Sequence, residues 1–403
     1  MLGGRLWAPL RSADYRRLWM AQLVSVVGDK VDQIALGILV YAKTGSELQM
    51  GIMLAISMLP AALFGMIAGA YVDRWDQRRT MIAADVLRAA CVGAVPFVAE
   101  WSLYAVYVLG FIAATIALFF EPAKLSLIPE IIGDGDLMAA NSLDSATSSV
   151  AELAGLAFGG VLVAWLGYRA AFFLDAGTFL LSAGFLLLIA HRPPEAASPK
   201  QFVSWVPVVR EASDGLRYVW RHPVLRDLLG VYSFAIMGVA ASTTFIFALA
   251  LNRFDAGAIG LTTLEGAITV GLLAGSVAVG RTDPSAPARK LLFGLLAFGV
   301  LVSLSAMTPS VAWTAAVLFC AGIANMFFYV PMATILQHDS EPSMRGRVFA
   351  AKQSISRVLS VIGFIGAGAL AETIGLTPSI LIAGAIVVVM ALYGWSRPRL
   401  RAA

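Results

Sequence analysis

Charged side chains interrupt several long apolar segments of this chain. The first such segment carries Asp29, Lys30 and Asp32 near its middle. A charge at the centre of a membrane-spanning helix costs roughly 2.5 to 3.5 kcal/mol, so it is expected only where it pairs, binds a ligand or carries a proton. The charged residues of other apolar segments that we assign to such roles are Arg88, Glu121, Lys124 and Glu152.

Two polar stripes follow from helical spacing, because residues three or four apart share a helix face. We expect the first stripe to line a water-filled cavity, and its members are Gln22, Ser25, Asp29, Asp32 and Gln33. The second stripe runs through Asn141, either Asp144 or Ser145, Ser148 and Glu152. A carboxyl group in a poorly solvated cavity can load and release a proton near neutral pH. Glu152 is the leading proton-carrier candidate, with Asp175 and Glu265 as competitors.

Two lysines have neighbours that indicate pairing. Lys30 lies about 100° around the helix from Asp29, so its side chain points in a different direction. It can bind a substrate anion, or it can form an ion pair with another helix that fixes the first helix against its neighbours. Glu121 and Lys124 are three residues apart, and the intervening Pro122 frees backbone groups. We therefore expect this second pair to face a cavity.

The remaining candidates lie in three other segments. Arg88 follows Asp85 by three residues, so the two can neutralise each other along one helix face, and a structural contact is favoured over substrate binding. Arg357 can form an ion pair with acidic residues of the other half of the chain. Asn325 and Tyr329, one turn apart, offer neutral hydrogen bonds to a cargo.

The composition places these residues in a bilayer. The 403 residues are 59% hydrophobic and 13% charged, which is more apolar surface than one soluble core of this size can bury. The net charge of +4 is scattered between apolar segments and does not indicate nucleic-acid binding. Cys91 and Cys320 have no local partners, so we expect no disulfide framework, metal site or cofactor. A nucleotide-binding glycine loop and an enzymatic constellation are both missing from the sequence.

We predict an all-α membrane protein with twelve transmembrane helices, since a spanning helix needs about 20 mainly apolar residues. The predicted spans are 18–41, 48–71, 80–98, 102–123, 142–165, 170–190, 225–250, 257–279, 291–308, 311–335, 349–371 and 378–396. Residues 1–190 form a six-helix half and residues 223–403 a second one. Between them, residues 191–222 read as a polar cytoplasmic linker with a short amphipathic helix.

Lysine and arginine positions set the orientation, because cytoplasmic loops retain these residues. With both termini in the cytoplasm, only Lys43, Arg169 and Arg253 fall in loops on the opposite side. We expect a multi-pass monomer in the lipid bilayer of the cytoplasmic (inner) membrane.

An internal repeat agrees with two halves. The residues that a shift of 208 positions superimposes include Gly155 with Gly363, Gly160 with Gly368, and Gly167 with Gly375. The coincidence predicts that the two six-helix halves are pseudo-symmetric.

The segment from Gly69 to Arg79 separates two apolar runs and has the composition of a gate. Asp73 can accept hydrogen bonds from, or face the positive N-terminus of, a helix in the other half, while the arginines pair with nearby acids. Alternatively, the arginines only anchor the topology. The residues that we assign to the gate are Gly69, Asp73, Arg74, Arg78 and Arg79.

With these motifs the chain resembles the major facilitator superfamily over nearly its whole length. The gate residues match the family pattern G-x-x-x-D-R-x-G-R-R, although Asp76-Gln77 lengthens it by one residue. The stretch from Asp214 to Pro223 is similar to the linker of the branch that contains macrolide efflux proteins and the enterobactin exporter. The stretch from Phe119 to Lys124 resembles that branch and also the lysophospholipid transporters.

Glycine spacing extends the resemblance. The segment Gly155–Gly160 is similar to the antiporter motif G-P-x-x-G-G, with Leu156 where proline is expected. In the family, rows of small residues four apart form the interface between the halves. The resemblance therefore places the Gly155 and Gly159 row, and the Gly271 and Gly275 row, at that interface.

The resemblance implies a secondary transporter rather than an enzyme. It would alternate access across the membrane and export a small amphipathic compound, drug-like, macrolide-like or siderophore-like, in exchange for protons. The alternative is a lysophospholipid flippase or facilitator that needs no proton gradient. A flippase would stay active after Glu152→Gln, whereas a proton antiporter would lose uphill export.

Overall fold

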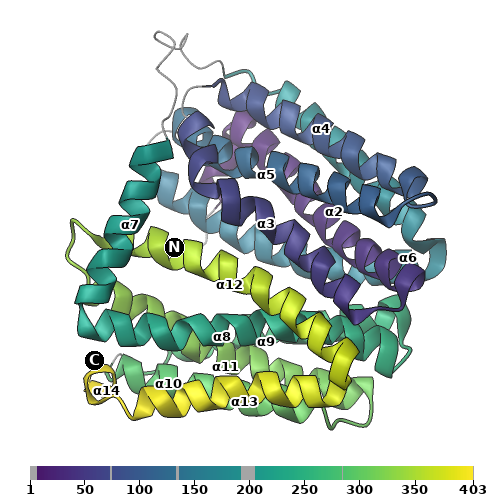
Figure 1. Ribbon diagram of the computed structural model, residues 1–403. Coiled ribbons are helices and arrows are strands. Elements are labelled where there is room, and N and C mark those ends of the chain that lie inside the picture. Colours follow the sequence, from purple (N-terminus) through teal and green to yellow (C-terminus); the bar gives the residue numbers. More distant parts are fainter. Residues whose placement is uncertain (1–6, 73–74, 133–135, 192–204, 284, 403) are drawn as a thin grey trace. The chain divides into compact units, whose positions relative to one another are not determined.

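The computed structural model describes residues 7–72, 75–132, 136–191, 205–283 and 285–402, and every regular element within them is a helix. Figure 1 traces these helices from purple at the N-terminus to yellow at the C-terminus. The elements up to residue 187 are η1 (Ala8–Arg11), α2 (Ala13–Thr44), α3 (Glu47–Val72), α4 (Gln77–Val98), α5 (Leu103–Ile132) and α6 (Leu137–Leu187). Those that follow are α7 (Trp205–Arg221), α8 (Pro223–Ala248), the π-helix η3 (Leu249–Arg253), α9 (Gly257–Gly280), α10 (Pro287–Ser305), α11 (Val311–His338), α12 (Arg345–Ile374), α13 (Leu376–Trp395) and α14 (Pro398–Ala402).

The membrane-crossing helices account for the predicted spans. Ten helices in the described ranges are long and apolar enough to cross a membrane. One of these, α6, has 51 residues but leaves helical geometry at Gly167, so it supplies the two spans predicted at 142–165 and 170–190. The charged helix α2, 32 residues long, matches the span at 18–41. The predicted all-α membrane fold is confirmed.

The predicted repeat has a structural counterpart at two sharp helix breaks. Gly167 has φ 77° and ψ 165°, and Gly375, its partner in the 208-residue shift, has φ 91° and ψ 157°. Positive φ values of this kind are accessible to glycine and strained for other residues. Equivalent positions of the two halves therefore turn the chain with nearly the same backbone geometry.

Two compact units divide the chain. One consists of Met1–Leu39 and Pro60–Ser204, and the other of Val40–Leu59 and Trp205–Ala403. In the second unit, Glu372 of α12 accepts hydrogen bonds from the hydroxyl of Ser46, at 2.7 Å, and from the backbone N–H of Leu48, at 3.3 Å. Glu372 thereby satisfies exposed donors where α3 begins.

Glycines bring helices of the same unit into close contact. A Cβ atom at Gly155 of α6 would lie 2.8 Å from Cβ of Lys30 on α2, and one at Gly271 of α9 would lie 2.1 Å from the carbonyl oxygen of Phe319 on α11. These two positions thus pack helices inside a unit. Both glycines contact a helix of their own unit, and the expectation that these rows form the interface between halves stays a prediction.

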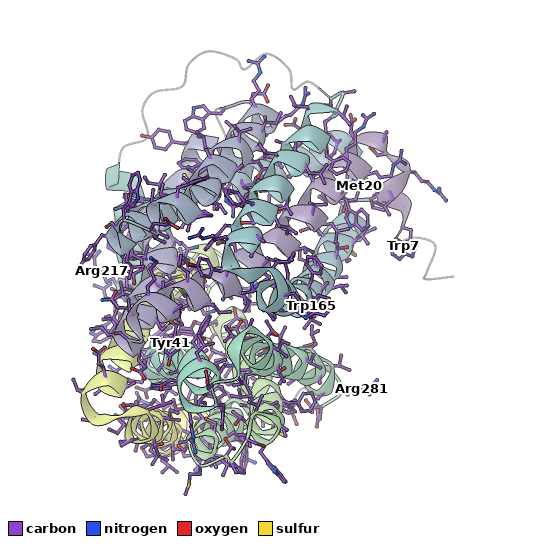
Figure 2. The ribbon with its side chains drawn as sticks, turned by 90° about the vertical axis from the view of Figure 1, so that its right-hand side faces the viewer. Trp7, Met20, Tyr41, Trp165, Arg217 and Arg281 are labelled. Atoms are coloured by element: carbon purple, nitrogen blue, oxygen red, sulfur yellow. The ribbon has the colours of Figure 1, made fainter. Side chains whose placement is uncertain are left out.

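Exposed polar and aromatic residues lie at helix ends. Trp165, just before the break at Gly167, is exposed, as is Trp101 between α4 and α5. Tryptophan at such positions is typical of membrane–water interfaces. Figure 2 labels Trp165 together with Arg281, which follows α9 and points away from the helices. Charged side chains that contact one another between membrane-spanning helices occur in the first unit.

Candidate functional site

Arg88 of α4 links α2 to α6 in the first unit. Its guanidinium donates a hydrogen bond to the carboxylate of Asp29 on α2, and its Cζ atom lies 4.0 Å from the centre of the Phe179 ring on α6. The spacing on α4 predicted Asp85 as the partner of Arg88. The carboxylate that pairs with Arg88 instead comes from another helix, because Asp85 is engaged elsewhere.

Asp85 and Asp175 are fully buried carboxyl groups. Asp85 Oδ2 accepts a hydrogen bond from the hydroxyl of Ser182 at 2.6 Å, and Asp175 Oδ1 accepts one from Thr178 at 3.0 Å. The second oxygen of each carboxyl has no hydrogen-bond partner among the described residues. Each residue therefore keeps one buried acceptor atom unused.

These residues form one electrostatic group, which we call the acid cluster: Asp29, Asp32, Asp85, Asp175 and Arg88. Arg88 interacts electrostatically with Asp29, Asp85 and Asp175, and Asp32 interacts with Asp29 and Asp175. A Cβ atom at Gly28 would lie 2.2 Å from Asp175 Oδ1. The absence of a side chain at Gly28 leaves room for Asp175 and Thr178 of α6 beside α2.

Lys30 and Glu152 form a second charged contact between α2 and α6. Lys30 Nζ lies 3.0 Å from Glu152 Oε1 and donates a 3.4 Å hydrogen bond to Gln33 on its own helix. The side chain of Glu152 is 44% exposed. Of the two alternatives for Lys30, a substrate anion or an ion pair with another helix, the structure contains the ion pair.

Lys124 of α5 is the most deeply buried cation of the first unit, with 2% of its side chain exposed. Its Nζ atom lies 2.9 Å from Glu121 Oε2 and 3.0 Å from Asp144 Oδ2. Glu121 is the partner that the three-residue spacing indicates, and Asp144 adds a contact from α6. The three residues join α5 to α6.

The gate residues are described only in part. Asp73 and Arg74 lie outside the described residues, as do the surroundings of Gly69 within α3. Arg78 donates hydrogen bonds to the carbonyl oxygens of Leu186, at 2.9 Å, and Leu187. These carbonyls belong to the last two residues of α6, so Arg78 caps the C-terminal end of α6 inside the first unit.

Arg79 differs from its neighbour Arg78. Its side chain is 87% exposed, and its Nε atom lies 3.5 Å from Asp76 Oδ2. Asp76 also accepts a 2.8 Å hydrogen bond from the backbone N–H of Arg79, which caps the first turn of α4. Asp76, which lengthens the loop by one residue, thus begins the next helix.

The other candidates lie on two sets of helices. On α2, Ser25 is buried, whereas Gln22 and Gln33 are partly exposed. In the second unit, Asn325 and Arg357 are partly exposed on α11 and α12, and Tyr329 is exposed. Charged candidates of the first unit meet at three places, which are centred on Arg88, Lys30 and Lys124. The candidates Asn325, Tyr329 and Arg357 belong to the second unit.

Sequence reasoning named Asp175 only as a competing proton carrier, left Asp85 out of the site, and missed their hydroxyl partners Ser182 and Thr178. Asp175 is the only acid between residues 153 and 194, which was a usable signal. Asp85 was taken as a local partner of Arg88, and nothing in the linear spacing connects it to Ser182, 97 residues away.

Known proteins are similar to this chain over most of its length. Residues 18–363 match the family model of the Major Facilitator Superfamily. The multidrug efflux pump Tap of Mycolicibacterium fortuitum is 29% identical over 94% of this chain and 95% of its own length. Macrolide efflux protein A of Streptococcus pyogenes is 24% identical over 93% of each chain.

Solved structures support the same fold. A bacterial homologue of the human lysosomal transporter Spinster, inward-facing and unoccupied, superimposes with a TM-score of 0.71 at 16% identity, covering 98% of both chains. The nucleoside transporter NupG gives a TM-score of 0.73 at 12% identity, covering 95% of this chain and 98% of its own. At these identities the likeness concerns the fold.

Proposed function

The chain belongs to the Major Facilitator Superfamily, and on that premise we propose that it exports a small amphipathic compound from the cytoplasm in exchange for protons. Transport proceeds by alternating access, with residues 1–190 and 223–403 as the moving halves and residues 191–222 as their cytoplasmic connection. The protein acts as a monomer in the inner membrane, with both termini in the cytoplasm.

The observation that carries proton coupling is the charge imbalance of the acid cluster. Four aspartates, Asp29, Asp32, Asp85 and Asp175, surround the single guanidinium of Arg88. Several uncompensated carboxylates cannot remain ionised together in a poorly solvated interior, so the group binds protons. A group that must hold protons in one conformation can release them in another, which is the requirement for coupling.

The individual residues divide this task. Arg88 pairs with Asp29 through a direct, charge-assisted hydrogen bond. Asp85 and Asp175 each present a buried carboxyl oxygen without a hydrogen-bond partner in the described chain, and these atoms accept the transported protons. The Lys30–Glu152 pair, more exposed, is a second point at which a proton or a charged cargo can exchange with the ion pair.

The outward direction rests on the relatives and on one motif. Two proteins that align with nearly the whole chain are named as efflux proteins. The segment Gly155–Gly160 is similar to the antiporter motif, and Gly155 packs directly against α2 at Lys30. Both favour export over import.

Transport into proteoliposomes tests the proposal. A macrolide, a catecholate siderophore and a lysophospholipid are offered with and without an imposed pH gradient. We expect at least one of the first two to accumulate only with the gradient, and Glu152→Gln to weaken this uphill uptake, while Asp283→Asn, in the exposed loop after α9, leaves it unchanged. Movement of the lysophospholipid alone, indifferent to the gradient and to Glu152→Gln, would favour a flippase and sink the antiport proposal.

A further inference from the structure

Lys352 is a buried cation in the second unit, in the first turns of α12. Only 5% of the residue is exposed. Its Nζ atom lies 5.1 Å from the centre of the Tyr232 ring on α8 and 4.7 Å from that of Tyr329 on α11. We call these three residues the lysine–tyrosine cluster.

The two tyrosines are held differently. Tyr232 is buried, shares a short hydrogen bond with the hydroxyl of Ser356, and stacks on Phe328 with ring centres 6.0 Å apart. Tyr329 is 43% exposed. Tyr232 is thus a fixed wall of the cluster, and Tyr329 forms its accessible side.

Lys352 differs from the buried or partly buried cations of the first unit. Three of those have carboxylate partners: Asp29 for Arg88, Glu152 for Lys30, and Glu121 with Asp144 for Lys124. Within the described part of the chain, no carboxylate pairs with Lys352. Contact with aromatic faces offsets only part of the cost of removing an ammonium group from water. Among the described residues, the cluster therefore offers a cation without a paired carboxylate.

We propose that the lysine–tyrosine cluster binds the anionic group, a carboxylate or phosphate, of an amphipathic ligand whose apolar body packs on Tyr329. This inference deepens the proposed function and rests on it, since the ligand is the transported compound. The anion supplies the counter-charge that Lys352 lacks, and the tyrosine rings provide contact area beside it. The first unit then handles protons, and the second recognises the charge of the cargo.

Equilibrium binding to the purified full-length protein in nonionic detergent tests the inference. The probes are dansylglycine, which carries a carboxylate, and dansylglycinamide, its neutral counterpart with the same fluorophore. We expect the wild type to bind dansylglycine about tenfold more tightly. Lys352→Met should abolish this preference, Lys352→Arg should keep most of it, and Lys290→Met, at the start of α10, should not change it.

Several results would overturn the inference. These are equal affinity for the two probes, binding of neither probe, an undiminished preference in Lys352→Met, or loss of the preference in a monodisperse Lys352→Arg variant. Acetate is the competitor that separates sources of the anion, and we expect it to displace dansylglycine poorly. Displacement by acetate at equal concentration would mean that the site takes a free anion and would contradict the amphipathic ligand. Because no gradient is used, the two proposals can fail separately. The binding test can fail while proton-coupled export holds, and the binding test can succeed while proton-coupled export fails.

Discussion

A Cβ atom at Gly28 would lie 2.2 Å from the Oδ1 atom of Asp175, a separation that packed atoms do not reach. Gly28→Ala must therefore displace the Asp175 and Thr178 side chains or push α2 away from α6, and overpacking of this kind costs about 1–3 kcal/mol. We expect a lower Tm in detergent and weaker transport. The matched control is Gly184→Ala on α6, where a Cβ atom meets nothing within 4 Å. Equal losses of Tm in the two variants would contradict the close approach.

Lys124→Met should destabilise the first unit strongly. The substitution leaves Glu121 and Asp144 facing each other without the buried ammonium that lies about 3 Å from both. Breaking a fully buried ion pair typically costs about 3–5 kcal/mol, and the loss here should lie below that range because the Glu121 side chain is 56% exposed. Thermal unfolding measures the loss, and the exposed Lys43→Met serves as the control, with an expected change within about 0.5 kcal/mol. A small loss for Lys124→Met would mean that the three charges contribute little to folding.

Adjacent arginines of the gate segment should behave differently. Arg78→Gln removes charge-assisted hydrogen bonds to the carbonyls of Leu186 and Leu187, each worth about 1.5–3 kcal/mol. Arg79→Gln changes an exposed side chain and should leave the Tm nearly unchanged. Both variants are compared in the same detergent. Similar Tm values for the two would show that Arg78 does not stabilise the end of α6.

Asp14 should make stability depend on acidic pH. It precedes the predicted first span, and although burial raises its pKa, the backbone N–H groups of Ala190 and His191 and the charge of Arg17 outweigh this, leaving the pKa below its ordinary value of 3.8. A carboxyl with a lowered folded-state pKa stabilises the fold above its ordinary pKa, and the contribution is lost as the pH falls through the folded value.

The measurement for Asp14 is the Tm difference between wild type and Asp14→Asn as a function of pH. We expect a constant wild-type advantage between about pH 5 and 7 that shrinks below about pH 4. An advantage that grows on acidification would contradict the role given to the ionised carboxylate.

Much of the fold was predictable from the sequence because lipid imposes simple requirements. Every backbone group must be satisfied within a helix, and each helix must be long and apolar enough to cross. Gly167 and Gly375 show how far this extends, since their equivalence in the repeat reappears as matching positive φ values. The charges at Asp29 and Lys30 were identified as candidates for the same reason.

The partners of those charges were less predictable. Glu121 and Lys124 share a helix, so their contact follows from spacing, whereas the contacts of Arg88 with Asp29 and of Asp85 with Ser182 depend on how α2, α4 and α6 pack. Helical periodicity fixes which residues share a face but not which face meets which neighbour. The glycine rows illustrate this point, because small residues permit close packing without specifying the partner helix.

The most direct test of the central claim is proton movement itself. Proteoliposomes containing a trapped pH-sensitive dye receive a compound found to be transported, and the lumenal pH is followed together with uptake. The account predicts a pH change that accompanies uptake in the wild type and is lost in Asp175→Asn, although that variant still binds the compound. Uptake by the wild type without any pH change, or an unaltered pH change in Asp175→Asn, would contradict proton coupling through the acid cluster.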